Sequence, residues 1–135
     1  MPYWRLHYHL VWSTANREPL ISDEFEETIR WSLERTFSRL NIIPHAVGVM
    51  PDHIHLAVSI PPKESLSQVV RQLKGASSHA INQRHDATFH WQSEYGAFTF
   101  SDHGLPDVIA YVANQRQHHQ SNKLLPRLER TDPDD

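Results

Sequence analysis

Apolar and polar side chains alternate along residues 3–14 and along residues 53–60. Successive side chains of a β-strand point to opposite faces, so this alternation predicts two strands. In the second of them Ile54, Leu56 and Val58 lie on the apolar face, which can pack on a core. His53 and His55 lie together on the other face, which we expect to be exposed. Residues 42–49 and 97–101 predict two further strands.

Three stretches predict helices. Ser22 is a candidate N-cap followed by acidic residues, which suit the positive end of a helix dipole. The apolar residues that follow it recur at helical spacing: Phe25, Ile29, Leu33, Phe37 and Leu40. A second helix begins after Ser65, with Gln68 three residues on as in a capping box. A third opens at residues 104–107 and is expected to run to about Ser121.

The order of these elements is strand, helix, strand, strand, helix, strand and a last helix. This order predicts an α+β fold, the ferredoxin-like βαββαβ arrangement, with an antiparallel sheet covered by two helices. The extra C-terminal helix carries a tyrosine, Tyr111. We expect one domain over residues 1–125 and an acidic, flexible tail over residues 126–135.

Composition narrows the classes of function. The chain of 135 residues has no cysteine, which excludes disulfides, thiolate metal sites and cysteine nucleophiles. It has no apolar run of membrane-spanning length and no signal-peptide pattern, so we expect a cytoplasmic protein without a membrane partner. The net charge of −3 argues against a broadly basic nucleic-acid binder. Acidic residues are concentrated in residues 18–34 and 129–135, however, so a local basic patch can still hold a nucleic acid.

His53 and His55 are candidate metal ligands. Two residues of a strand span about 6.6 Å, which lets two imidazole nitrogens converge on one ion. The alternative is a strand that carries two of the eleven histidines by chance. His7 and His9 form a second pair of this kind in the first strand, and we interpret them as having no site role because no matched partner is evident.

Tyr111, Gln115 and His118 share one face of the last predicted helix, at positions i, i+4 and i+7. A tyrosine at such a position is usually a half-buried core residue. In combination with the histidine pair, however, the residues on this face resemble the motif of a known family.

The chain resembles the single-tyrosine (Y1) HUH transposases of the insertion-sequence 200/605 type. The resemblance covers the chain to about His119. It runs through HYHLVWST, PDHIHLAVSIPPKESLSQVVRQLKGASS, WQSEYGAF and YVANQ. The family fold is ferredoxin-like, in agreement with the order of elements.

The resemblance implies that Tyr111 is the nucleophile and that His53, His55 and Gln115 hold Mg²⁺ or Mn²⁺. It implies cleavage and rejoining of single-stranded DNA with hairpin ends through a 5′-phosphotyrosine intermediate. It also implies a homodimer, in which the histidine pair of one subunit works with the tyrosine helix of the other. Asp52, beside the pair, is a candidate fourth ligand or proton acceptor, but we expect it to shape a turn.

Basic and aromatic side chains are candidates for DNA contact. We name Lys63, Arg71, Lys74 and Arg84 for phosphates, with Arg5 and Arg116 as weaker candidates, and Trp91 and Tyr95 for base stacking. Two other functions stay open. One is a non-cutting relative that only binds single-stranded nucleic acid, and the other is a metal-dependent phosphodiesterase in which water attacks. Formation of a covalent DNA adduct separates both from a transposase.

Overall fold

A computed structural model describes residues 4–114 and Thr131. Its strands are β1 (His7–Ser13), β2 (Ile43–Val49), β3 (His53–Ser59) and β4 (Gly96–Phe100). Its helices are α1 (Asp23–Leu40), α2 (Leu66–His85) and α3 (Leu105–Ala113), with short 3₁₀ turns η1 (Ala15–Arg17) and η2 (Asp102–Gly104). This order confirms the ferredoxin-like prediction. Among the described residues, no helix is long and apolar enough to cross a membrane.

The four strands form one antiparallel sheet in the order β2-β3-β1-β4. The two central strands, β1 and β3, pair along their whole length, from His7 opposite Ser59 to Ser13 opposite His53. This register places the N-terminal half of β1 beside the end of β3. Histidines that are far apart in the sequence therefore meet on one face.

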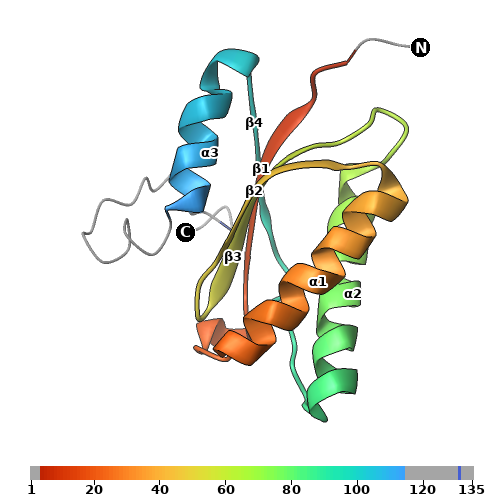
Figure 1. The fold of residues 1–135 in the computed structure, drawn as a ribbon, viewed down its shortest axis with the longest axis vertical. Helices are drawn as coiled ribbons and strands as arrows, with labels where there is room; N and C mark the ends of the chain where they lie inside the picture. The colour runs from red at the N-terminus through yellow and green to blue at the C-terminus, as the bar shows by residue number, and fades with distance from the viewer. Residues whose placement is uncertain (1–3, 115–130, 132–135) are drawn as a thin grey trace.

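Helices α1 and α2 pack on one face of the sheet, and helix α3 lies on the other (Figure 1). Under α1 and α2 lies the main core, which contains Leu10, Trp12, Ile54, Leu56, Leu33 and Leu73. Burial of each such side chain contributes about 1.5–3 kcal/mol. The predicted caps are confirmed, because Ser22 accepts a hydrogen bond from the Phe25 amide and Ser65 accepts one from the Gln68 amide.

Helix α3 covers the histidine face of the sheet. Val108 and Val112 pack against Ala57 of β3, flanked by Ala46 and Phe100. The expectation that this face is exposed was therefore wrong: β3 is buried on both faces, and every residue from His53 to Ser59 is buried. The prediction failed because the docking of a C-terminal helix is a contact between distant segments, which strand alternation does not record.

Two boundaries differ from the predicted ones. The first strand begins at His7, because β3 ends at Ser59 and β4 ends at Phe100, and both pair with His7. Tyr3 lies outside the described residues. Helix α3 ends at Ala113, with Asn114 as its C-cap, and the predicted extension over residues 115–121 also lies outside them.

Candidate active site

His53 and His55 point toward helix α3 from neighbouring positions of β3, with ring centroids 4.9 Å apart. The Nδ1 of His53 donates to the carboxylate of Asp52 at 2.6 Å. Asp52 belongs to the turn between β2 and β3, and its carbonyl accepts from the Thr14 amide at 2.8 Å. The turn is thus tied to the end of β1. Asp52 does shape a turn as predicted, and it also orients the adjacent imidazole.

His55 has a different partner. Its Nδ1 lies 2.8 Å from the Nε2 of His9 in β1, and both side chains are 0% exposed. His9 was interpreted as having no site role because no matched partner was evident, and the structure gives it a partner in His55. The antiparallel register of β1 and β3 brings the two residues together, and this pairing is not visible in either strand alone.

These two hydrogen bonds determine which atoms can bind a metal. An imidazole that donates through Nδ1 carries its lone pair on Nε2, and ligand histidines commonly use their second nitrogen in this way. His53 and His55 each use Nδ1 for the hydrogen bonds described above. When both rings donate through Nδ1, the pair fits a cation bound through the two Nε2 atoms. Within residues 4–114 and 131, no three His, Cys, Asp or Glu side chains are grouped to hold a metal.

Tyr111 lies beside this pair. Its ring centroid is 6.1 Å from that of His55 and 6.5 Å from that of His9, and the rings are close to perpendicular. The side chain is 5% exposed, and its neighbour Val112 is in contact with the sheet. A single chain thus places its own tyrosine next to its own histidine pair. The expected third ligand, Gln115, lies outside the described residues, as do His118 and His119.

A second group of histidines occupies the other end of the same face. The Ser59 hydroxyl lies 2.7 Å from Nδ1 of His7 and 2.6 Å from Nε2 of His45. The Nε2 of His7 bonds the carboxylate of Asp102 in η2, and the Arg5 guanidinium lies 3.7 Å from that carboxylate. One arrangement of protons satisfies every contact: His45 donates to Ser59, Ser59 donates to His7, and His7 donates to Asp102.

Titration in this second group is shifted by its surroundings. The hydrogen bond from His7 holds the pKa of the Asp102 carboxyl below its ordinary value, and the nearby Arg5 charge acts in the same direction. Burial lowers the pKa of His45, and repulsion between the protonated rings of His45 and His7 lowers it further. Both shifts favour the state in which Asp102 is ionised and His45 is neutral.

The residues predicted to contact DNA differ in their surroundings. Lys63 and Arg71 are exposed. The Lys74 ammonium donates to the carbonyls of Gln92 and Glu94, and burial lowers its pKa. Lys74 therefore stabilises the loop before β4. Trp91 is partly buried against the main core, where it packs edge-on against Trp12 and donates to the Ser77 hydroxyl.

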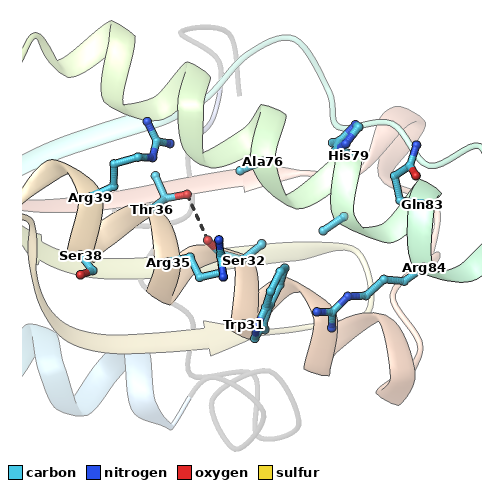
Figure 2. A pocket seen from close by; sticks show the side chains of 11 residues that line it. Trp31, Ser32, Arg35, Thr36, Ser38, Arg39, Ala76, His79, Gln83 and Arg84 are labelled. Carbon is cyan, nitrogen blue, oxygen red and sulfur yellow. Dashed lines mark hydrogen bonds between the residues drawn. The ribbon is translucent and has the colours of Figure 1, made fainter.

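Arg84 lies in a groove between α1 and α2, on the face of the helices turned away from the sheet (Figure 2). Its guanidinium is 3.7 Å from the centroid of the Trp31 ring, and that of Arg35 is 4.8 Å from it. Arg39 and His79 also line the groove, and none of its described lining residues is acidic. The sheet separates this cationic groove from the histidine face.

Comparison with known proteins gives one family. The family model described as "Transposase IS200 like" matches residues 2–115, a range that contains His53, His55, Tyr111 and Gln115. The ISDra2 transposase TnpA of Deinococcus radiodurans is 26% identical over 119 residues, which are 83% of this chain and 85% of that protein. The IS200 transposase of Salmonella typhimurium is 31% identical over 75 residues, 56% of this chain and 49% of its own length.

Solved structures agree with this result. A crystal structure described as a transposase candidate from Deinococcus radiodurans R1 is 28% identical with a TM-score of 0.65, over 85% of this chain and 95% of that one. A REP-associated tyrosine transposase bound to a REP hairpin has a TM-score of 0.69, over 88% of this chain and 74% of that one. At 16% identity, the second likeness concerns the fold alone. With a family model that spans most of its length, the chain belongs to the IS200-like (Y1) transposase family.

Proposed function

We propose that this transposase cleaves and rejoins single-stranded DNA at hairpin-marked ends of a mobile element, with Tyr111 as the nucleophile. The observation that carries the proposal is the position of the Tyr111 ring, 6.1 Å from the His55 ring on the buried histidine face. Family membership supports the reaction class. The structural relative that is described as bound to a hairpin supports the choice of DNA partner.

The reaction exchanges one phosphodiester for another. The Tyr111 oxygen forms a bond to the phosphorus of the scissile phosphate, and the bond from phosphorus to the 3′ oxygen breaks. The phenol proton is transferred, in net terms, to the 3′ oxygen, which leaves as a hydroxyl. The 5′ phosphate stays on Tyr111, and attack by another 3′ hydroxyl reverses the step. No ATP is needed, because the number of phosphodiester bonds does not change.

A phenol with an ordinary pKa near 10 is a weak nucleophile at neutral pH and needs an activated phosphate. Mg²⁺ or Mn²⁺ at the histidine pair would supply this activation as a Lewis acid. His53 and His55 would bind it through Nε2, with Gln115 as the third ligand. These three ligands are neutral, so they leave the charge of the cation undiminished for the phosphate, and we expect weak binding before DNA joins the site.

Access to Tyr111 involves helix α3. Since Tyr111 is 5% exposed, we propose that a shift of α3 relative to the sheet opens the way for a phosphate to its hydroxyl. The buried apolar cluster under α3 consists of Ala57, Val108 and Val112, with Ala46 and Phe100 packed against it, and is smaller than the core under α1 and α2. A small apolar contact favours such a shift, because less surface has to be exposed.

The DNA and the partner subunit are part of the same proposal. Lys63 and Arg71 are exposed, and Arg84 lies in the cationic groove, so these three can reach phosphates. Such contacts give affinity without sequence preference. We propose a homodimer with shared active sites, as in the family. Tyr111 already lies beside the histidine pair of its own chain, so exchange of α3 between subunits would replace one equivalent arrangement by another.

The test is a denaturing gel of the protein with labelled single-stranded hairpin DNA from its own flanking sequence, with Mn²⁺ or EDTA. We expect a metal-dependent band of protein joined to DNA, which Tyr111→Phe abolishes. Tyr95→Phe is the matched control, because Tyr95 packs against the main core away from the histidines, and it should keep the band.

The other outcomes identify the alternatives. An adduct that persists in Tyr111→Phe refutes the assignment of the nucleophile. Binding without an adduct indicates a non-cutting relative. Metal-dependent cleavage without an adduct indicates a phosphodiesterase in which water attacks.

A further inference from the structure

We propose that His9 is a positioning residue, which accepts a hydrogen bond from His55 and thereby holds the His55 lone pair on Nε2. The inference rests on the proposed function in so far as His55 binds a metal. The inference predicts the tautomer of His55, and this tautomer can be measured without metal or DNA.

The ring of His9, in β1, is held between side chains of the two neighbouring strands, β3 and β4. Its Nε2 is 2.8 Å from Nδ1 of His55 on one side. The His55, His9 and Phe98 rings stack in a row across β3, β1 and β4, with centroid distances of 5.0 and 5.8 Å and interplanar angles of 23° and 26°. His9 and His55 are both 0% exposed, so bulk water does not compete for their hydrogen bond. The ring of His9 therefore has little freedom to turn away.

Two proton arrangements are compatible with this hydrogen bond. If His55 donates through Nδ1, its Nε2 has a lone pair that can bind a cation. If His9 donates instead, His55 carries its proton on Nε2 and cannot be a ligand. His53 does not face this choice, because an ionised Asp52 can only accept. The acceptor role of His9 is thus the condition under which both histidines of the pair can act together.

His9 would act through His55 and would not be a ligand itself, since the nitrogen nearest the pair is the one that faces Nδ1 of His55. Loss of such an outer hydrogen-bond partner typically weakens metal affinity by about 10- to 100-fold. We expect this effect in His9→Phe, which keeps a flat ring in the stack but has no acceptor. His9→Gln supplies an amide oxygen as acceptor and should bind the metal within a few-fold of the unmodified protein.

His7→Phe is the matched control. His7 lies on the same strand and the same face, but its two nitrogens bond Ser59 and Asp102 at the other end of the sheet. We expect it to lower stability without changing metal affinity. Thermal unfolding of every variant separates a general loss of folding from a local change at His55.

The experiment is ¹⁵N NMR of the imidazole rings, followed by a titration with Mn²⁺ that measures broadening of the His55 signals. We expect the Nδ1–H tautomer for His55 in the unmodified protein, and a midpoint about 10- to 100-fold higher in folded His9→Phe. An Nε2–H tautomer for His55, or an unchanged midpoint in folded His9→Phe, would overturn the inference.

The covalent-adduct gel is run in parallel. If the unmodified protein forms the Tyr111 adduct while His9→Phe keeps its Mn²⁺ midpoint, this inference fails and the proposed function stands. If no adduct forms but His55 has the Nδ1–H tautomer and His9→Phe shifts the midpoint, the proposed function fails and the role of His9 stands.

Discussion

Two histidine clusters occupy opposite ends of one sheet face, and they differ in which ring nitrogens their neighbours use. The metal-side cluster consists of His9, His53, His55 and Asp52, and the Asp102 cluster consists of His7, His45, Ser59 and Asp102. Between them lies the apolar contact of Ala57 with Val108 and Val112. The clusters share strands and residue types, and each contains buried histidines, so the difference between them lies in their hydrogen bonds.

In the Asp102 cluster both nitrogens of His7 are used, Nδ1 by Ser59 and Nε2 by Asp102. Such a ring has no lone pair directed at a cation. In the metal-side cluster the hydrogen bonds of His53 and His55 are made through Nδ1. In the proposed arrangement both rings donate, which directs their lone pairs to Nε2. We therefore propose that the partners on neighbouring elements decide whether a histidine pair in a strand binds a metal or forms a structural link.

The largest expected contrast between the clusters is in catalysis. His55→Ala removes a proposed ligand, and we expect adduct formation to fall by more than about 100-fold, beyond the range for an outer hydrogen-bond partner. His45→Ala, in the Asp102 cluster, should change the rate of adduct formation by less than about threefold, because His45 contacts neither the histidine pair nor Tyr111 in the hydrogen bonds described. The measurement is the rate of adduct formation at saturating Mn²⁺. Equal losses in the two variants would contradict the division into two clusters.

The second contrast is in stability. Asp102→Ala removes the carboxylate that accepts from His7 and connects β1 to the turn before α3. We expect a lower urea midpoint with an unchanged slope, since a buried imidazole N–H loses its acceptor. Asp107→Ala is the control, because Asp107 is an exposed acid in the first turn of α3. A midpoint in Asp102→Ala equal to that of Asp107→Ala would show that the link contributes nothing.

The order of elements could be predicted from the sequence because its signals are local. Ser22 and Ser65 are read from the residues that follow them, and the faces of β3 are read from alternation. The resemblance also directed attention to His53, His55 and Tyr111 before any geometry was known, and the structure places these three together.

The assignment of His7 and His9 to different clusters could not be predicted in this way. The two residues belong to one strand pattern, and only the register with β3 pairs His7 with Ser59 and brings His9 beside His55. Coverage of the histidine face by α3 is another contact between distant segments. A search through the antiparallel registers of β1 and β3 for facing polar pairs would have found His7 opposite Ser59. It would have missed His9, which faces Ala57 and reaches His55 diagonally.

The smallest expected contrast is in the pH dependence of stability. The folded protein holds the pKa of His45 below its ordinary value of 6.5, so below that pH the unfolded chain binds more protons at this residue than the folded protein does. The stability that neutral His45 contributes is therefore fully present above pH 6.5 and is lost as the pH falls through the lowered pKa. Asp102 acts in a separate window, because its lowered pKa confines the loss of its contribution to pH values below 3.8. The measurement is urea unfolding of the unmodified protein and of His45→Gln from about pH 7.5 to about pH 5, a range that brackets the titration of a histidine. The free energy of unfolding should fall less steeply with decreasing pH in the variant. Glutamine keeps a hydrogen-bond donor for Ser59 but does not titrate. Identical slopes in the two proteins would mean that His45 has the same proton affinity in the folded and unfolded states. The hydrogen bond of His45 to Ser59 would then link the strands without a role in the pH dependence of stability.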